Sequence, residues 1–369
     1  MELSFTNKKD KEYVLQKAYN FKFESKIPFD KSLLIKGDNF DGMSVLLKNS
    51  DIKGKITLAY FDPPFNTNQT FTISNERVST ISRVKDGIIA YSDKMTDDEY
   101  FEFIRERLII LKELMAENGS IYFHIDYKIG HYIKILMDEV FGEKCFKNDI
   151  TRIKSNPKNF SRKAYGNEKD MILFYTINPQ KNVWNEVREP LSEDEIRKNF
   201  SKIDEKGRYY TTIPLHAPGE SNGITGEAWR GMLPPKGRHW RTDPKNFDIL
   251  DENGDIEWSK NGNPRIKKYA LEHSGKKIQD IWTFKDPQNP IYPTEKNMDM
   301  IKMIIQQSSN PGDIVFDFFA GSGGTLLAAE SLGRKWIGID NSDFAITTIK
   351  NRLMGTEFKY YDLKDGSVQ

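Results

Sequence analysis

The segment NPGDIVFDFFAGSGGTLLAAESLGRKWIGID, residues 310–340, decides the fold class. It opens with a turn at Asn310–Asp313, continues with the apolar run IVFDFF, and passes through small residues into a helix that ends near residue 332. A second apolar run, KWIGID, follows that helix. The order strand, helix, strand is typical of an open, doubly wound α/β sheet.

The first half of the chain alternates strands and helices in the same way. Residues 54–62 form a short apolar run that stops at a pair of prolines, as a buried strand does where it enters a loop. Thr96 and Glu99 have capping-box spacing, and apolar residues recur at helical spacing after them, so we predict an amphipathic helix over 96–118 that closes on Gly119. The remaining elements that we predict are strands over 120–125 and 171–176 and helices over about 128–141, over about 296–308 and from about 342 onwards.

Residues 180–280 differ in character from both halves. They scatter Gly, Pro, Asn and Trp, show few long apolar periods, and contain turn dipeptides such as Asn222–Gly223. We therefore predict one α/β domain that is interrupted by an irregular insertion. The predicted boundaries are 1–29 for an N-terminal extension, 30–176 and 282–369 for the two halves of the α/β domain, and 177–281 for the insertion.

The composition limits the classes of partner. With 55 basic and 54 acidic side chains the formal net charge is +1, which neither demands nor excludes a polyanion. The single cysteine, Cys145, excludes an intramolecular disulfide and a cysteine zinc cluster. The five histidines show no metal spacing, and we expect His124, inside an apolar strand, to be packed rather than catalytic. We predict a cytoplasmic protein with no metal and no membrane partner, since no apolar run has the length of a signal peptide or a membrane span.

The glycine-rich loop has the features of a cofactor site. Asp317 lies at a strand end, and the small residues after it let the backbone approach a ligand at the N-terminus of a helix. Asp340 ends the next strand, where its carboxylate can accept hydrogen bonds from both hydroxyls of a ribose. These features indicate a cofactor that contains adenosine, with a structural tight turn and a helix N-cap as the alternatives, and the lack of a Gly-Lys-Ser/Thr sequence argues against nucleotide hydrolysis. The candidate contacts are Asp317, Phe319, Gly321, Ser322, Gly323 and Asp340.

Asp62, Pro63, Pro64 and Phe65 stand where the first apolar run ends. Consecutive prolines fix the backbone and so set the direction of the carbonyl oxygens and the flanking side chains. An exocyclic amine is a poor nucleophile, and hydrogen bonds accepted by the Asp62 carboxylate and the Pro63 carbonyl would make its nitrogen more nucleophilic. Phe65 could stack on an extruded base. The alternative is a buried strand that ends in a proline-rich turn.

These two motifs resemble those of the amino methyltransferases that act on DNA. Asp62–Phe65 resembles their catalytic Asp-Pro-Pro-Tyr motif, and Asp317–Thr325 resembles their cofactor loop. The catalytic motif comes first in this chain, which is the order of the β class of the family. The resemblance implies a circularly permuted, Rossmann-like sheet that uses S-adenosylmethionine, with 30–176 as the catalytic half, 282–369 as the cofactor-binding half and 177–281 as the target-recognition domain.

Further segments extend the resemblance. Tyr292–Lys296 matches a segment ahead of the family's cofactor loop, which implies cofactor contacts from Thr294 and Lys296. Asp38 resembles the acid that meets the adenine of the cofactor. The sequences GDNFDGM, from residue 37, and DPPFNT, from residue 62, are also similar to modification subunits of type III restriction systems.

The resemblance implies methyl transfer to N6 of a flipped adenine in double-stranded DNA. Asp62, rather than a serine, favours adenine over cytosine, and the Phe65 that replaces the usual tyrosine keeps the stacking face. A cytosine N4 methyltransferase, and a methyltransferase that acts on RNA or on a protein amide, are the other enzymes that fit. A catalytically silent DNA-binding specificity subunit is the alternative from another class. A homodimer and a restriction subunit are the protein partners that the resemblance leaves open.

Two basic segments, 151–170 and 229–241, interleave cations with aromatic residues. Such segments can neutralise phosphates, stack on unpaired bases and contact guanine edges through arginine. Their place in and beside the insertion leads us to expect that the insertion selects the DNA sequence, with solvated surface loops as the alternative. The candidate DNA contacts are Arg152, Lys154, Lys158, Arg162, Lys163, Arg230, Arg238 and Arg241.

Overall fold

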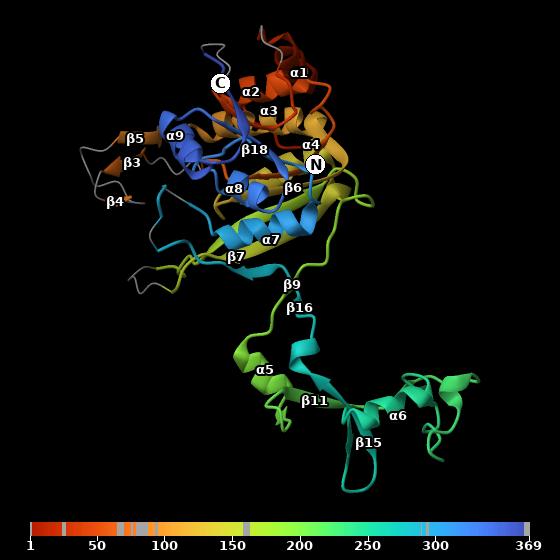
Figure 1. Ribbon diagram of the computed structural model, residues 1–369. Coiled ribbons are helices and arrows are strands. Elements are labelled where there is room, and N and C mark those ends of the chain that lie inside the picture. Colours follow the sequence, from red (N-terminus) through yellow and green to blue (C-terminus); the bar gives the residue numbers. More distant parts are fainter. Residues whose placement is uncertain are drawn as a thin grey trace. The chain divides into compact units, whose positions relative to one another are not determined.

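The chain forms two compact units (Figure 1). The computed structural model describes residues 2–23, 27–64, 70–74, 77–78, 88–92, 95–157, 163–288, 290–292 and 295–364. The first unit combines Met1–Val187 with Gln279–Gln369, and the second unit is Arg188–Ile278. Segments from both ends of the sequence therefore build the first unit.

The first unit is built on a nine-stranded sheet with the order β17-β7-β8-β6-β2-β18-β19-β1-β20. Strand β8 runs antiparallel to both of its neighbours, and the other neighbouring strands are parallel. Strand β2 pairs with β18, which confirms the prediction of one Rossmann-like α/β sheet made from both halves of the chain. The strands are β1 (Ser32–Lys36), β2 (Ile56–Phe61), β6 (Met115–Ile125), β7 (Phe146–Ile153), β8 (Lys169–Thr176), β17 (Ile281–Thr283), β18 (Ile314–Asp317), β19 (Lys335–Asp340) and β20 (Phe358–Asp362).

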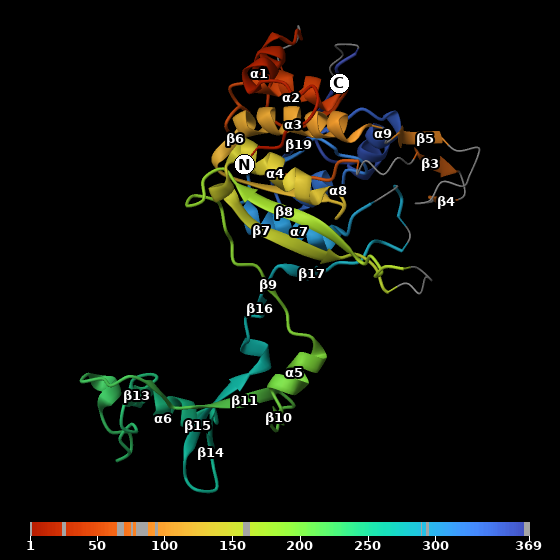
Figure 2. The ribbon, with the colours of Figure 1, turned by 180° about the vertical axis from the view of Figure 1, so that it is seen from behind.

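Helices cover both faces of this sheet. Helices α1 to α4 share one buried apolar cluster with β1, β2 and β18, whereas α7 packs against α8 (Figures 1 and 2). The helices are α1 (Lys11–Asn20), α2 (Asn39–Leu47), α3 (Asp97–Leu114), α4 (Gly130–Phe141), α7 (Met298–Ser308), α8 (Gly324–Ser331) and α9 (Asp343–Arg352). None of the helices in the described part of the chain is long and apolar enough to cross a membrane. A separate sheet, β4-β3-β5, consists of β3 (Thr70–Ser74), β4 (Arg77–Val78) and β5 (Ile88–Ser92).

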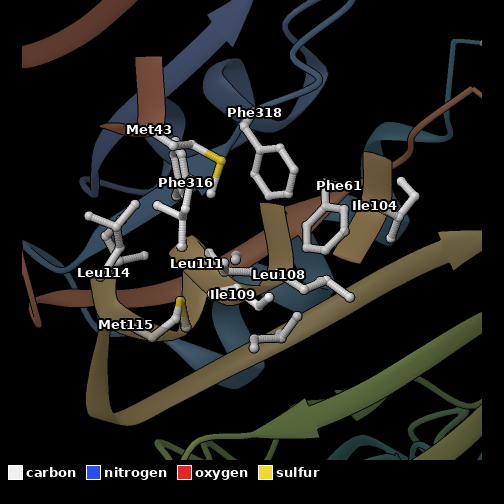
Figure 3. Close-up of a cluster of buried hydrophobic side chains, with 14 of the residues drawn as sticks. Met43, Phe61, Ile104, Leu108, Ile109, Leu111, Leu114, Met115, Phe316 and Phe318 are labelled. Atoms are coloured by element: carbon white, nitrogen blue, oxygen red, sulfur yellow. The ribbon is translucent and has the colours of Figure 1, made fainter. Parts of the chain in front are cut away.

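Aromatic side chains fill the core beneath the ends of β2 and β18 (Figure 3). The ring centroids of Phe61 and Phe318 are 4.5 Å apart, and those of Phe61 and Phe123 are 4.6 Å apart. Burying one such side chain stabilises the fold by roughly 1.5–3 kcal/mol. Phe61 precedes Asp62 in the sequence and Phe318 follows Asp317, so this packing fixes the positions of both aspartates.

The structure shifts two predicted boundaries. The capping box is present, because the Thr96 backbone N–H donates to Glu99 Oε2 at 2.9 Å. Helix α3 ends at Leu114 rather than at residue 118, because Met115 already pairs with Ile56 in the sheet. Strand β6 is accordingly longer than the predicted strand, and β7 covers residues that the sequence analysis treats partly as a basic segment.

The second unit has a small apolar core and mainly short antiparallel strands. It contains a sheet with the order β10-β11-β15-β14 and the pairs β12-β13 and β16-β9. The unit is shorter than the predicted insertion, 177–281, because residues 177–187 and β17 belong to the first unit. Its core consists of Leu215, Trp229, Trp240, Phe247, Ile256 and Ile266. Its elements are β9 (Arg188–Glu189), α5 (Glu193–Asn199), β10 (Lys202–Ile203), β11 (Tyr209–Pro214), β12 (His216–Pro218), β13 (Arg238–Trp240), α6 (Pro244–Glu252), β14 (Ile256–Trp258), β15 (Pro264–Tyr269) and β16 (Lys276–Lys277).

Candidate active site

Four aspartates lie at the ends of four neighbouring parallel strands. Asp62 comes directly after β2, and Asp317 and Asp340 are the last residues of β18 and β19. Asp38 follows β1, which ends at Lys36. The strands have the order β2-β18-β19-β1, so the four aspartates share the carboxyl edge of the sheet. Open α/β sheets bind their ligands at this edge.

Asp62 is bound by a lysine with little exposure to solvent. Lys296 Nζ lies 2.5 Å from Asp62 Oδ2, and the two side chains are only 10% and 18% exposed. The other carboxylate oxygen, Asp62 Oδ1, is buried and has no hydrogen-bond partner among the residues that the structure describes. A buried acceptor without a donor costs about 1–3 kcal/mol, so this oxygen offers a site for a donor from a ligand. The resemblance assigns Lys296 to the cofactor, whereas the structure places its ammonium group on Asp62.

The prolines after Asp62 are anchored to helix α3. Tyr100 Oη donates a hydrogen bond of 2.7 Å to the Pro64 carbonyl, and Tyr100 is buried. Pro63 is buried as well, and the predicted stacking residue Phe65 lies outside the described residues. Sequence reasoning did not find Tyr100. The available signal was its place in the first turn of the capped helix that is predicted next after the proline motif.

Backbone amides surround the two aspartates of the glycine-rich loop. Asp317 is buried and accepts a hydrogen bond of 3.0 Å from the Phe319 N–H. Burial raises the pKa of Asp317 to about 7. Asp340 Oδ2 accepts from the Gly321 N–H at 2.8 Å, and its Oδ1 accepts from the Ser342 N–H at 2.9 Å. Burial also raises the pKa of Asp340.

The conformation of this loop depends on glycine. Gly321 and Gly323 have φ angles of 49° and 78°, in the left-handed region that other residues rarely adopt. A Cβ atom on Gly323 would also lie 2.8 Å from Ile349 Cγ1. The neighbouring Ser322 is buried, and its carbonyl accepts from Arg352 Nη1 at 3.1 Å. The loop is therefore fixed against α9, through a contact with Arg352 that the sequence analysis did not include.

The segment before α7 connects the glycine-rich loop with Asp62. Tyr292 is buried, and its ring lies 3.5 Å from the position that a Cβ atom on Gly321 would take. Lys296, at the other end of the same motif, reaches Asp62. The predicted cofactor contact Thr294 lies outside the described residues. One short segment thus contacts both the predicted cofactor loop and the predicted catalytic acid.

Asp38 begins helix α2. Its Oδ1 accepts from the Phe40 N–H at 2.8 Å, and Arg107 Nη2 lies 3.3 Å from its Oδ2. Arg107 is buried, with its guanidinium carbon 3.5 Å from the centroid of the Phe103 ring. A surface groove of about 1090 Å³ is lined in part by these four residues. The Asp38 side chain is 49% exposed, so a ligand can reach it.

Next to Asp62, strand β6 carries a buried histidine with polar groups at both ring nitrogens. His124 Nδ1 lies 3.0 Å from Tyr60 Oη, and Nε2 lies 3.2 Å from Asp170 Oδ2. Asp62 Oδ1 is 3.9 Å from Nδ1. His124 is fully buried, and both of its ring nitrogens face ionisable groups, which its apolar strand did not suggest.

Asp170 also binds two cations that the sequence analysis assigned to DNA. Arg152 Nη1 lies 3.4 Å from Asp170 Oδ2, and Lys154 Nζ lies 2.5 Å from Asp170 Oδ1. Arg152 Nη2 pairs with Asp286 at 2.5 Å, and the Arg152 side chain is fully buried. The predicted contact of Arg152 with DNA is wrong, because a buried and doubly paired guanidinium cannot reach a phosphate. Lys154 keeps 24% of its side chain exposed.

The remaining basic candidates differ in their surroundings. Lys158 and Arg162 lie outside the described residues. Arg230, in the second unit, pairs with two carboxylates of α6 at 2.9 Å and 2.6 Å. The candidates that the structure describes as exposed with no carboxylate partner are Lys163, Arg238 and Arg241.

Comparison with known families identifies the class of protein. Residues 56–351 match the model of a family described as DNA methylase. The chain belongs to this family and is a DNA methyltransferase. The resemblance inferred from the proline motif and the glycine-rich loop is therefore confirmed.

The relatives include type II methyltransferases and Mod subunits of type III restriction–modification enzymes. The chain is 40% identical over 366 residues to the type II methyltransferase M.EcaI of Enterobacter cloacae, which covers 95% of this chain and 77% of that protein. It is 25% identical over 338 residues to the StyLTI Mod subunit, part of a type III restriction–modification enzyme of Salmonella typhimurium, covering 82% of this chain and 50% of that subunit. The crystal structure of an M1.HpyAVI–SAM complex aligns with a TM-score of 0.45 and 18% identity, covering 87% of this chain and 100% of that one.

Proposed function

We propose that this protein transfers a methyl group from S-adenosylmethionine to N6 of adenine in double-stranded DNA, as the methyltransferase of a restriction–modification system. The observation that supports this proposal is Asp62 Oδ1, a buried acceptor without a partner among the described residues, at the ligand-binding edge of the sheet. The amino group of adenine has two N–H donors and no charge. It would satisfy this oxygen without bringing a further ion into the site.

Asp62 acts on the amine through hydrogen bonding. The lone pair of an exocyclic amine is delocalised into the ring, and donation to Asp62 Oδ1 and the Pro63 carbonyl favours a tetrahedral, more nucleophilic nitrogen. When bound, S-adenosylmethionine would supply the methyl group on a sulfonium, whose sulfur would leave with the bonding pair. The hydrogen bond from Tyr100 to the Pro64 carbonyl holds the turn, so the two acceptors keep their separation. Positioning of this kind requires no covalent enzyme intermediate.

The target base has to leave the duplex, at a cost of a few kcal/mol. We assign the compensating stacking contact to Phe65, which directly follows the two prolines. Because a phenyl ring offers the same face as a phenol, the absence of the usual tyrosine hydroxyl leaves this contact intact.

The acids of the other three strands would hold the cofactor. Asp340 accepts one amide N–H on each oxygen, and a carboxylate has about four acceptor positions, so capacity for two ribose hydroxyls remains. Asp317 is buried with a raised pKa, and a cationic group of the cofactor beside it would favour its ionised form. Asp38 is accessible from the adjoining groove and would contact the adenine. The main chain from Phe319 to Gly323 would lie against the remainder of the cofactor.

Target recognition is assigned to the insertion between the two halves of the sheet. Exposed arginines can contact guanine in the major groove through two hydrogen bonds, and Arg238 and Arg241 are exposed in this unit. Lys163, exposed in the first unit, would contact phosphates. Arg230 can join them only when it leaves its carboxylate partners on α6.

Methylation of cytosine at N4 is the second candidate. The family contains enzymes of both specificities, and the amine of cytosine would satisfy Asp62 Oδ1 in the same way. The Asp at position 62 favours adenine through resemblance alone, so the modified nucleoside decides between the two.

The test is a methylation assay with labelled S-adenosylmethionine and unmethylated double-stranded DNA, followed by digestion and mass spectrometry of the labelled nucleoside. We expect N6-methyladenine from the wild type and a loss of at least about 1,000-fold in rate from Asp62→Ala, because a preorganised acceptor is removed. Asp51→Ala, which changes an exposed aspartate ahead of β2, is the matched control. N4-methylcytosine would overturn the base assignment. Full activity of Asp62→Ala would overturn the mechanism.

A further inference from the structure

Two strands next to β6 place ionisable groups around the buried His124. Strand β2 and the turn after it contribute Tyr60, whose hydroxyl lies 3.0 Å from Nδ1, and Asp62, whose Oδ1 lies 3.9 Å from Nδ1. Strand β8 contributes Asp170, whose Oδ2 lies 3.2 Å from Nε2. The imidazole therefore lies between two carboxylates, one of which is the acid proposed to act on the substrate.

A cation lies on the outer side of each carboxylate. Lys296 binds Asp62 Oδ2 at 2.5 Å. Lys154 binds Asp170 Oδ1 at 2.5 Å, and Arg152 binds Asp170 Oδ2 at 3.4 Å. The imidazole and its two carboxylates therefore lie between Lys296 at one end and Lys154 and Arg152 at the other.

The hydrogen-bond pattern places the proton of His124 on Nε2. Burial opposes the ionisation of Asp170, but the hydrogen bond from His124 and the nearby cations outweigh it and hold the pKa of Asp170 below its ordinary value. Ionised Asp170 can only accept, so Nε2–H donates to it. Burial raises the pKa of Tyr60 well above 10, so its hydroxyl stays protonated and donates to Nδ1. Burial also lowers the pKa of His124, so the ring is neutral at pH 7 with its basic nitrogen on the Asp62 side.

The reaction proposed above releases a proton beside this ring. Attack on the methyl group leaves a positive charge on the amine nitrogen, and one N–H proton must leave to give the neutral methylamino product. Asp62 Oδ1 accepts that N–H and is the first acceptor of the proton. The ammonium group of Lys296 on Oδ2 disfavours a protonated, neutral Asp62, so a second base is needed.

We propose that His124 takes this proton from Asp62 and holds it until the product leaves. This inference rests on the function proposed above. The amine N–H bond breaks as Asp62 Oδ1 gains the proton; Oδ1 then releases it to Nδ1, and the Tyr60 hydroxyl rotates from donor to acceptor. After product release the proton returns through Asp62 to water. His124 touches neither substrate nor cofactor, so it is a positioning residue that acts through Asp62.

The distance of 3.9 Å between Asp62 Oδ1 and His124 Nδ1 is longer than a hydrogen bond. Hydrogen bonds of this kind are often long in free enzymes and shorten when the substrate binds. The imidazolium formed by the transfer would lie between Asp62 and Asp170, and each carboxylate favours this charged form of the ring.

Tyr122 is a second buried polar residue on the same strand, and its hydroxyl and its ring contact residues other than those around His124. It stands two residues before His124 and therefore points to the same face of the sheet. Its hydroxyl lies 2.8 Å from Ser308 Oγ, and its ring stacks on Phe174 with the centroids 4.4 Å apart. Because these contacts link it to no carboxylate among the described residues, Tyr122→Phe is a matched control.

The experiment measures the single-turnover rate of methyl transfer at saturating DNA, as a function of pH, with the full chain. His124→Gln keeps a donor for Asp170 but cannot take up a proton. We expect its rate at neutral pH to fall about 100-fold, as for the loss of a general base. In the wild type, protonation of His124 should lower the rate below pH 6.5, and the pH profile of the variant should not show this decline. Tyr122→Phe should keep both the rate and the decline.

A second variant keeps the inference testable if His124→Gln does not fold, which circular dichroism would reveal. Lys154→Met removes a partly exposed cation from Asp170, so the pKa of His124 should rise and the decline should move to higher pH. A wild-type rate and pH profile in His124→Gln, or an unmoved decline in Lys154→Met, would overturn the inference and leave the methyl transfer intact. No methyl transfer by the wild type would overturn the proposed function instead.

Discussion

Two strands at the ligand-binding edge, β2 and β19, hold the carboxylates at their ends by different means. At the end of β2, Asp62 is bound by the side chain of Lys296, and its buried Oδ1 lacks a partner among the described residues. At the end of β19, Asp340 is bound by the backbone N–H groups of Gly321 and Ser342, at 2.8 Å and 2.9 Å. One carboxylate depends on a side-chain cation, and the other depends on the main chain.

This difference suits two tasks. A backbone amide keeps its position and its charge at every pH, so it can hold an acid that binds a ligand. A lysine can move or change its partner, so it suits an acid that takes part in proton transfer. We therefore expect substitutions at the β18 and β19 ends to change stability and cofactor affinity, and substitutions at the β2 end to change the rate.

The largest effect is expected from Asp317→Asn at the end of β18. Burial raises the pKa of Asp317 from 3.8 to about 7, so the unfolded chain releases this proton at a lower pH than the folded protein does. The wild type therefore loses stability between about pH 4 and about pH 7, by up to about 4 kcal/mol at 1.36 kcal/mol per pH unit. Asn does not titrate and keeps an oxygen for the Phe319 N–H, so the variant avoids this loss.

Denaturant unfolding at several pH values tests this prediction. The free energy of unfolding of Asp317→Asn minus that of the wild type should grow as the pH rises from 4 to 7 and stay level above that range. Asp149→Asn, which changes an exposed aspartate on β7, controls for the loss of one surface charge. A difference that is the same at every pH would contradict a titrating Asp317.

At the β2 end, Lys296→Met should lower kcat about 100-fold, which corresponds to about 3 kcal/mol in the barrier. The ammonium group orients Asp62, and without it the carboxylate can turn away from the amine. Lys296→Arg keeps a cation and should recover part of the rate. The KM for S-adenosylmethionine should change little.

Steady-state kinetics separate this role from the one implied by the family resemblance. A cofactor contact predicts a higher KM for S-adenosylmethionine with kcat nearly unchanged. Lys302→Met, on the following helix α7, controls for the loss of a nearby positive charge. If Lys296→Met changed only the KM for S-adenosylmethionine, Lys296 would be a cofactor contact. The contrast between Asp62 and Asp340 would then no longer include a cation that orients Asp62.

The sequence predicted those elements of the fold that depend on nearby residues, such as turns, helix caps and apolar periodicity. The strand, loop, helix and strand within 310–340 occur as β18, α8 and β19, and the capping box at Thr96 starts α3. The end of α3 was not predictable, because Met115 leaves the helix to pair with Ile56. Helical periodicity contains no information about such a distant partner.

The candidate site divides in the same way. The apolar runs predicted Asp62, Asp317 and Asp340 at strand ends, and the family resemblance added Asp38. Neither predicted which side chains they bind. Arg152, in a basic run, looks like a DNA contact until β7 pairs with β8 and places it on Asp170. His124 looks like a packed core residue until the pairing of β6 with β8 places the Asp170 carboxylate next to Nε2.

The smallest effect is expected from Gly323→Ala, with Gly333→Ala as the matched control. Both glycines are left-handed, with φ angles of 78° and 71°, so each Ala variant should lose about 1–2 kcal/mol of stability from backbone strain. A Cβ atom on Gly333 meets nothing within 4 Å, whereas one on Gly323 lies 2.8 Å from Ile349. Gly323→Ala should therefore be the less stable of the two.

The two variants also test whether the backbone N–H groups that bind Asp340 are needed for cofactor binding. Gly333 lies after α8, so its substitution should leave the KM for S-adenosylmethionine unchanged. Gly323→Ala should raise that KM, because the Ile349 contact pushes the loop away from α9 and shifts the Gly321 N–H that binds Asp340. Equal KM values for both variants, alongside unequal stabilities, would mean that the cofactor does not need the amides in their present positions. The backbone amides of the loop would then stabilise the fold without contributing to cofactor binding. The difference between the ends of β2 and β19 would be a difference in how the two acids are held in the folded protein, not in how ligands bind.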